Sequence, residues 1–236
     1  MCKPSSNRIL AVYGTEMGTT KNEADKVIDD WKKKENLTVT LLEGNDAADQ
    51  FDSITPENYD LIVIMTSSYG DGDAPSGFGK FLYKLYAAVE AKTKPFDGLE
   101  HSVLGFGSTA YYTFQNVPRL CDRLLGEMGS RRFLMRTEID EMDDYDENNA
   151  KIKNWSDSVA KYGKGNKEKT NTSQSVCEWS NPKSEVYEKK LGPDGYELGA
   201  GPSGNSGLIA FSAIGVAAIA AYFTYYRTND ESGVEA

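Results

Sequence analysis

The chain has 236 residues and a formal net charge of −10, with 39% hydrophobic and 26% charged residues. The negative charge disfavours a nucleic-acid partner, because phosphate backbones recruit lysine and arginine, and it favours a basic protein partner. The single histidine, His101, and three scattered cysteines argue against a His-based metal site, a hydrolytic triad and a disulfide framework.

Residues 8 to 162 alternate between strand-like and helix-like patterns, which predicts an α/β domain. Buried strands are expected at residues 9–13, 37–42, 61–65, 102–106 and 133–135. Helices are expected at residues 19–34, 78–91, 117–128 and 148–162. Strands that alternate with helices form a parallel sheet covered on both faces, and such sheets bind ligands at the carboxyl ends of their strands.

Two of the expected helix boundaries carry local signals. Thr20 and Glu23 have the spacing of a capping box at the start of the first helix. Gly129 follows the third helix and is expected to stop it, since glycine readily adopts the left-handed conformation of a helix C-terminus.

The C-terminal part of the chain differs in composition from this domain. Residues 163–206 are rich in Gly, Lys, Asn, Ser, Pro and Glu, which predicts a disordered linker. Residues 208–226 carry no charge, and about 19 helical residues span roughly 28 Å, close to the ~30 Å hydrocarbon core of a bilayer. We predict a transmembrane helix there, with Tyr222, Tyr225 and Tyr226 in an interfacial aromatic belt; the alternative is a buried alanine-rich core helix. The predicted division is 1–162 for the domain, 163–206 for the linker, 207–227 for the transmembrane helix and 228–236 for a short tail.

The segment YGTEMGTTKNEA, residues 13–24, follows the first predicted strand and opens a helix. Backbone N–H groups at a helix N-terminus favour a bound anion, the threonines add hydroxyl donors, and Gly14 and Gly18 let the backbone approach closely. The two glycines stand one residue too close for a Walker A loop, which favours a monophosphate over a triphosphate. The alternative is an ordinary capped helix start.

The third predicted strand ends in the segment MTSSYGDGDAPSG, residues 65–77. Its glycines permit positive φ and close approach to a flat ligand, and Tyr69 offers a large π face. Asp71 and Asp73 add negative charge without a cluster of metal ligands around them. The alternative is a solvated turn with an incidental tyrosine.

The fourth predicted strand runs into GFGSTAYYTF, residues 105–114. This segment matches the G-x-G-x-x-A form of the dinucleotide fingerprint, but that fingerprint belongs to the first strand–helix turn of a unit and this turn is the fourth. The second aromatic beside a glycine-rich loop is more informative, and we expect Tyr69 and Tyr111 on opposite faces of one planar ring. A phosphate at the first loop and a planar aromatic at the other two predict FMN as the cofactor.

The segments GTEMGTT, TSSYGDGDAPSGFGKF and LGFGSTAYYTFQNVPRLCDRLLGEMGSRRF together resemble the FMN domain of the diflavin reductases. That family includes cytochrome P-450 reductase, the sulfite reductase flavoprotein and the reductase part of nitric oxide synthase. The resemblance covers residues 8–160 and implies a flavodoxin-like, doubly wound, five-stranded parallel sheet with strand order 2-1-3-4-5. The family's FAD and NADPH modules are expected to be absent, and the anchor is expected at the C-terminus.

The resemblance also implies roles for individual residues. The first loop holds the FMN phosphate, Tyr69 and Tyr111 stack on the two faces of the isoalloxazine ring, and Asp140 lies near the ribityl chain. Met17 stands where a hydroxyl residue is usual and Ser108 where asparagine is common, so these two positions depart from the family's pattern. No catalytic side chain and no metal ligand are predicted. The implied cofactor-binding residues are Thr15, Glu16, Met17, Gly18, Thr19, Thr20, Ser67, Ser68, Tyr69, Gly70, Asp71, Gly72, Gly105, Phe106, Gly107, Ser108, Tyr111, Phe114 and Asp140.

We therefore predict an FMN-binding electron carrier, held in a lipid bilayer by residues 208–226. It would accept electrons from a separate FAD-containing NAD(P)H reductase and pass them to a membrane-associated redox acceptor. The FMN domain is expected in the cytosol, on the endoplasmic reticulum or another organelle surface. Residues 140–147, with Asp71 and Asp73, are a candidate docking face for a basic partner, and the alternative is a solvated loop. Two other functions stay open, a flavodoxin-like NAD(P)H:quinone reductase and a non-redox scaffold with a degenerate flavin site.

Overall fold

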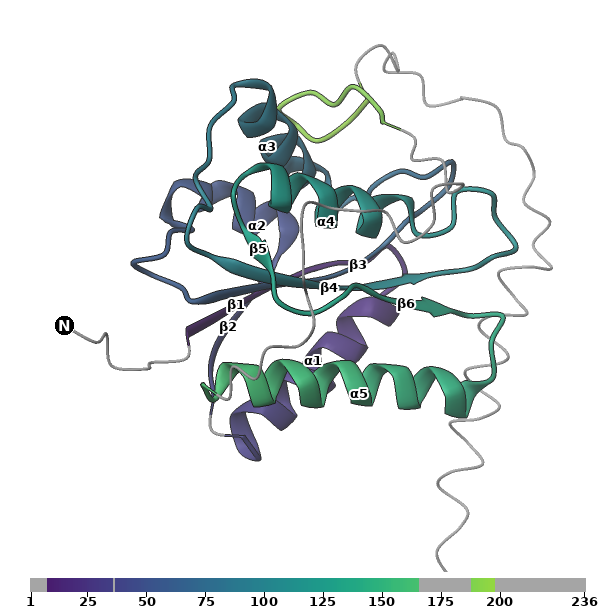
Figure 1. Cartoon of the computed structure of the whole chain (residues 1–236). Coiled ribbons are helices and arrows are strands. Elements are labelled where there is room, and N and C mark those ends of the chain that lie inside the picture. Colours follow the sequence, from purple (N-terminus) through teal and green to yellow (C-terminus); the bar gives the residue numbers. More distant parts are fainter. Residues whose placement is uncertain (1–7, 36, 166–187, 198–236) are drawn as a thin grey trace, which may run out of the picture. The chain divides into compact units, whose positions relative to one another are not determined.

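The computed structural model describes residues 8–35, 37–165 and 188–197, and its elements are labelled in Figure 1. The strands are β1 (Arg8–Gly14), β2 (Thr38–Glu43), β3 (Leu61–Ser67), β4 (Glu100–Gly107), β5 (Arg131–Arg132) and β6 (Thr137–Asp140). The helices are α1 (Thr19–Lys33), α2 (Gly44–Asp49), α3 (Gly79–Glu90), α4 (Asn116–Glu127) and α5 (Tyr145–Gly163), with a short 3₁₀ turn at Phe51–Ser53.

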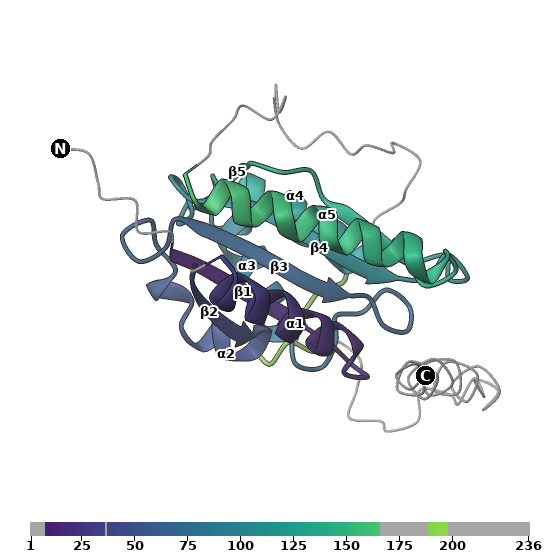
Figure 2. The ribbon, with the colours of Figure 1, turned by 90° about the horizontal axis from the view of Figure 1, so that it is seen from below.

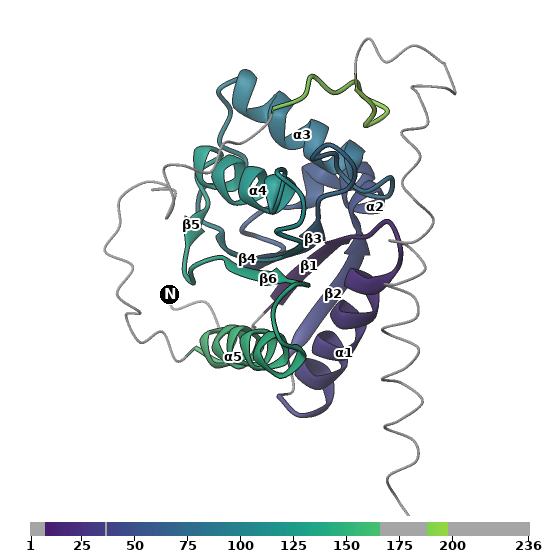
Figure 3. The ribbon, with the colours of Figure 1, turned by 90° about the vertical axis from the view of Figure 1, so that its right-hand side faces the viewer.

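These strands form one parallel sheet in the order β2-β1-β3-β4-β5, and β6 also pairs with β4. The predicted strand order 2-1-3-4-5 is confirmed. The register places Gly14 opposite Thr66 and Ser67 opposite Phe106, so β1, β3 and β4 end at one edge of the sheet. The loops that follow these three strands therefore lie together, and Figure 3 views the sheet from this edge.

Helices cover both faces of the sheet, α2, α3 and α4 on one and α1 and α5 on the other (Figures 1 and 2). Along β1, Leu10 and Val12 pack under α2, α3 and α4, whereas Ile9 and Ala11 pack against α1 and α5. All four side chains are fully buried. This double coverage is why the predicted strands are continuous apolar runs with no polar alternation.

The fifth strand was predicted at residues 133–135, and this prediction is wrong. The edge strand is split into β5 and β6, with residues 133–135 in the interruption. Phe133 leaves the strand path to stack on Tyr162, with ring centroids 4.2 Å apart. Arg132 at the end of β5 and Arg136 just before β6 both reach the carboxylate of Asp122. An ion-pair partner on α4 therefore sets the course of this segment.

The helix boundaries follow the predictions with two corrections. Thr20 and Glu23 do not form a capping box, because α1 begins at Thr19, its N-cap is Gly18, and no side chain caps it. Gly18 has φ +89°, a conformation that favours glycine. The short helix α2 was not predicted. Gly129 adopts φ +95° directly after α4, which confirms its predicted role as a stop.

The predicted linker is ordered in part. Residues 188–197 fold back onto the domain beside α3, where Leu191 packs against the same core cluster as Leu82 (Figure 1). These ten positions of the predicted linker pack on the domain through Leu191 and through close contact at Gly195. The predicted transmembrane segment, residues 208–226, lies outside the described residues. Among those that are described, no helix is both long enough and apolar enough to cross a bilayer.

Candidate functional site

The loop after β1 presents unpaired backbone donors at the start of α1. The N–H of Gly18 is occupied by the hydroxyl of Thr15, at 2.9 Å. In contrast, the N–H groups of Glu16, Met17 and Thr19 donate to no other group within the described part of the chain. Open N–H groups at the positive end of a helix dipole form an anion site, because each of them needs an acceptor. This arrangement suits one phosphate group.

The side chains of this loop divide between binding and support. Thr19 is exposed and Thr15 is half-buried, so both lie where a ligand can reach the loop, whereas Thr20 is buried. The carboxylate of Glu16 accepts a hydrogen bond from the backbone N–H of Ser76, at 2.8 Å. Glu16 therefore fastens the first loop to the second through its carboxylate. Met17 is 76% exposed.

The loop after β3 closes on itself between Tyr69 and Asp73. The N–H of Tyr69 donates to the carbonyl of Asp73 at 2.9 Å, and the N–H of Asp73 donates back at 2.7 Å. Gly70 and Gly72 have φ of +49° and +86°, which the tight turn requires. A Cβ on Gly72 would lie 2.9 Å from the amide nitrogen of Asn116, so this glycine allows close approach to the third loop.

Four hydrogen bonds join the second loop to the third. Each pairs one residue after β3 with one residue near the start of α4, so the loops carrying Tyr69 and Tyr111 are held side by side. The pairs are Ser68 Oγ with Val117 N–H (2.9 Å), Gly70 carbonyl with Thr113 Oγ1 (3.4 Å), Asp71 Oδ1 with Tyr112 Oη (3.1 Å) and Gly72 carbonyl with Asn116 Nδ2 (2.8 Å). Thr113 and Asn116 were not predicted, because nothing local in the sequence marks a bond between residues more than forty positions apart.

Large apolar side chains are exposed around these loops. Tyr69 is 53% exposed and Tyr111 45%. Exposed apolar groups that gather in one place mark a binding surface. The exposed members on the loops at this edge are Met17, Tyr69, Tyr111, Tyr112 and Met142.

The third loop owes its shape to residues that were predicted to touch the cofactor. A Cβ on Gly105 would lie 2.7 Å from the ring of Pro118, so this glycine lets α4 pack on β4. Phe106 and Ser108 are buried, and the Ser108 hydroxyl accepts the N–H of Ala110 at 3.3 Å. Half-buried Phe114 lies over Gly107, where a Cβ would meet its ring at 3.1 Å.

Asp140 ends β6 at the same edge, beside Gly107 of β4. One carboxylate oxygen accepts the backbone N–H groups of Thr109 and Met142, each at 3.0 Å. Burial raises the pKa of Asp140, but these hydrogen bonds outweigh it and the net pKa is lowered. The side chain of Asp140 therefore fastens the third loop to the end of β6. Its place near the ribityl chain stays a prediction.

The predicted acidic docking face is partly committed to the fold. Asp143 and Glu147 both pair with Lys151, at 2.7 and 2.8 Å. Asp144 is the N-cap of α5, and its carboxylate accepts the N–H of Asp146 at 2.9 Å. Only part of the predicted charge at residues 140–147 therefore remains free of such contacts and exposed to a partner.

A serine, a histidine and an aspartate meet beneath α4. His101 Nδ1 lies 2.9 Å from Ser130 Oγ, and Nε2 lies 3.3 Å from Asp122 Oδ1. All three residues are buried, at 5% exposure or less. A substrate has no access to them, so the arrangement holds the core and performs no hydrolysis.

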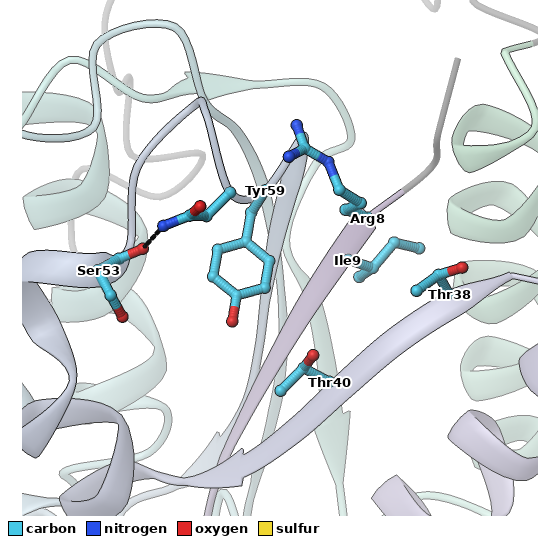
Figure 4. Close-up of a pocket in the computed structure, with 7 residues that line it drawn as sticks. Arg8, Ile9, Thr38, Thr40, Ser53 and Tyr59 are labelled. Carbon is cyan, nitrogen blue, oxygen red and sulfur yellow. Dashed lines mark hydrogen bonds between the residues drawn. The ribbon is translucent and has the colours of Figure 1, made fainter. Parts of the chain in front are cut away.

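A cavity of about 320 Å³ lies at the opposite edge of the sheet, where β1 and β2 begin (Figure 4). Arg8, the charged residue in its lining, forms an ion pair with Asp60 at 3.2 Å. The cavity is remote from the open N–H groups of α1 and from both exposed tyrosines, so it does not belong to the anion site. It is lined by Arg8, Ile9, Thr38, Thr40, Ser53, Asn58 and Tyr59.

Comparison with known proteins identifies the relatives of this domain. It is 30% identical over 144 residues to NADPH oxidoreductase A of Dictyostelium discoideum, covering 60% of this chain and 22% of the relative. It is 29% identical over 158 residues to a bifunctional cytochrome P450/NADPH–P450 reductase of Bacillus cereus, covering 66% of this chain and 14% of the relative. The match therefore spans less than a quarter of either relative, and it confirms the resemblance to reductases of the P-450 type.

The fold and the family agree with these relatives. A Streptococcus pneumoniae flavodoxin superposes with a TM-score of 0.53 at 22% identity, over 66% of this chain and 99% of that protein. The sequence profile described as flavodoxin matches residues 12–155, which include all three loops. The chain therefore belongs to the flavodoxin family of electron-transfer flavoproteins, whose cofactor, FMN, is the one that the three loops predicted.

Proposed function

We propose that this chain is a one-electron carrier in which the three loops bind FMN. The observation that carries the proposal is the pairing of open N–H groups at the start of α1 with two exposed tyrosines on adjoining loops. The residues fit the cofactor: the N–H groups of residues 16, 17 and 19, with the Thr19 hydroxyl, suit one phosphate. Tyr69 and Tyr111 offer rings for a flat partner.

Bound FMN supplies the redox chemistry, so no side chain need act as an acid or a base. The chain's own residues bind, orient and exclude water. The loop–loop hydrogen bonds support this role, because they hold both tyrosine loops in place before a ligand arrives. Because the loops are already in place, the protein need not rearrange when the flavin gains or loses an electron, and this favours fast electron exchange.

We infer that the electron donor is a separate FAD-containing NAD(P)H reductase and that the acceptor is a membrane-associated redox protein. The relatives support a reductase partner, since NADPH oxidoreductase A and the bifunctional cytochrome P450/NADPH–P450 reductase are both much longer than the segment that matches this chain. The anion site is matched to the FMN phosphate, and the net charge of −10 would repel NADPH and attract a basic partner.

The carrier proposal is tested by measuring whether the protein takes electrons from NADPH directly or only from an added reductase. Purified FMN-loaded protein is expected to oxidise NADPH negligibly alone, yet to reduce cytochrome c when a catalytic amount of an FAD-containing NADPH reductase is added. The rate with a basic partner is expected to fall as salt is raised, because the Debye length shortens to about 8 Å at physiological ionic strength. Rapid, salt-insensitive NADPH turnover by the protein alone would favour the quinone reductase. Failure to retain any flavin would favour the non-redox scaffold.

We also propose that residues 208–226 anchor the chain in a membrane, with the flavin domain in the cytosol. Truncation after Ser206 is expected to release a soluble yellow protein, because it removes the uncharged segment. Truncation after Arg227 is the matched control, and it should leave the protein in carbonate-washed membranes. If the shorter truncate still sediments with washed membranes, the anchor lies elsewhere. Cell fractionation of the full chain then identifies the organelle.

A further inference from the structure

The segment of residues 188–197, which we call the strap, forms a small hairpin. Leu191 and Glu197 make an antiparallel bridge, and the N–H of Gly192 donates to the carbonyl of Tyr196 at 2.8 Å. The turn between them closes with the N–H of Gly195 on the carbonyl of Gly192, at 2.9 Å. The strap is therefore a folded element with its own hydrogen bonds.

Backbone contact seats the strap on α3 (Figures 1 and 3). Gly195 lies against Gly79, the first residue of α3, so closely that a Cβ on either glycine would overlap the other's backbone or its neighbour's. Leu191 packs against the core cluster beneath α2, α3 and α4. A cavity of only about 10 Å³ lies between Leu191 of the strap and the domain, at the lower limit of the volume that one buried water needs.

Charges tie the N-terminal end of the strap to the domain. Glu188 pairs with Arg123 of α4. Lys189 Nζ lies 2.5 Å from Asp73 Oδ1 and 3.8 Å from a carboxylate oxygen of Glu197. Burial lowers the pKa of Lys189, but the hydrogen bond and charge of Asp73 outweigh it and raise the pKa, so the ammonium group stays charged.

Asp73 is the residue that closes the second loop. Its backbone exchanges two hydrogen bonds with Tyr69, one of the two tyrosines proposed to contact the ring. Asp71 stands on the same loop, so the loop carries two carboxylates, and Lys189 is in contact with one of them. The strap thus touches the tyrosine loop through one side chain, although the two are 116 residues apart in sequence.

We propose that Lys189 is a positioning residue for the flavin loop, which acts through Asp73 to hold Tyr69 in place and to offset negative charge beside the cofactor. This inference rests on the proposed function. It predicts that the strap increases FMN affinity and makes the midpoint potential of the bound flavin less negative, because a nearby positive charge favours the reduced, more negative form. A strap that only fills a surface groove would change neither quantity.

The test uses the full-length chain, stripped of flavin and titrated with FMN. Lys189→Ala is expected to raise the Kd for FMN roughly two- to fivefold, the scale of a partly exposed ion pair. It should also speed amide exchange at residues 69–73 and shift the midpoint potential to a more negative value. Lys189→Arg should restore all three quantities. Lys190→Ala removes the same charge from the neighbouring exposed position and should leave them unchanged.

A double-mutant cycle separates positioning from general destabilisation. In an Asp73→Asn background, Lys189→Ala should have no further effect, because the ion pair is already lost. Gly195→Ala should reproduce the affinity loss without any change of charge, since its Cβ would overlap the backbone of Lys80. If Lys189→Ala matches Lys190→Ala while FMN still binds, the inference is wrong and the proposed function stands. If the unaltered chain binds no FMN, the proposed function itself fails.

Discussion

Replacement of Asp122 by alanine is expected to lower the free energy of unfolding by about 3–5 kcal/mol, the scale of a broken buried ion pair. Asp122 is 1% exposed. Its carboxylate accepts from Arg132 at 2.8 and 2.6 Å and from Arg136 at 2.6 Å, and it lies 3.3 Å from His101 Nε2. The substitution leaves Arg132 and Arg136 without their central partner in a place where water cannot replace it. Urea unfolding followed by tryptophan fluorescence measures the loss.

The same carboxylate makes stability depend on pH. Burial alone would raise the pKa of Asp122, but the hydrogen bond to His101 and the charges of Arg132 and Arg136 outweigh it, and the pKa falls from 3.8 to about 2. A pKa that is lower in the folded state stabilises the fold fully above pH 3.8, and this contribution is lost as the pH falls toward about 2. The unaltered protein should therefore lose stability over this range, and Asp122→Asn should lose less.

An exposed ion pair provides the matched control. Asp29 of α1 pairs with Lys33 at 2.8 Å, with both side chains more than half exposed. Asp29→Ala should leave the urea midpoint nearly unchanged, because solvent screens this pair. If Asp122→Ala is as mild as Asp29→Ala, the buried network does not hold the edge of the sheet as inferred.

Removal of the tyrosine rings should have the largest effect on the cofactor. Tyr69→Ala and Tyr111→Ala are each expected to weaken FMN binding by roughly five- to a hundredfold, because stacking on an aromatic ring contributes about 1–3 kcal/mol per base-like ring. Both rings are about half exposed, so the substitutions remove little from the core. Stacked tyrosines quench flavin fluorescence, and emission at saturating FMN should therefore rise in each variant.

Tyr145→Ala is the control for this pair, since Tyr145 is similarly exposed but lies at the start of α5, outside the three loops. It should bind FMN as the unaltered protein does. If neither Tyr69→Ala nor Tyr111→Ala differs from this control in affinity or emission, the rings do not flank the flavin. If both single variants bind FMN more weakly, the double variant Tyr69→Ala/Tyr111→Ala tests whether the two rings act independently. Two independent stacking faces should add their losses of binding free energy.

The amino-acid sequence by itself determined the buried strands, four of the helices that cover the sheet and the three loops at its edge, whereas the strand order came from the resemblance to a known family. Runs such as residues 61–65 are apolar at every position, and only a strand buried on both faces requires that. Glycine at 18 and 129 marked a loop and a helix end where the backbone takes positive φ. These features depend on a few neighbouring residues, so local chemistry is sufficient to reveal them.

Only the tertiary structure decided what each of these groups touches. Asp122 on α4 splits the fifth strand through two arginines that follow it by ten and fourteen positions. Gly72 makes room for Asn116, a residue of the neighbouring loop. Residues 188–197 have the composition of a linker, yet they dock because Leu191 and Gly195 find partners more than 100 positions earlier. Such contacts are set by the approach of distant segments, and no spacing pattern along the chain encodes them.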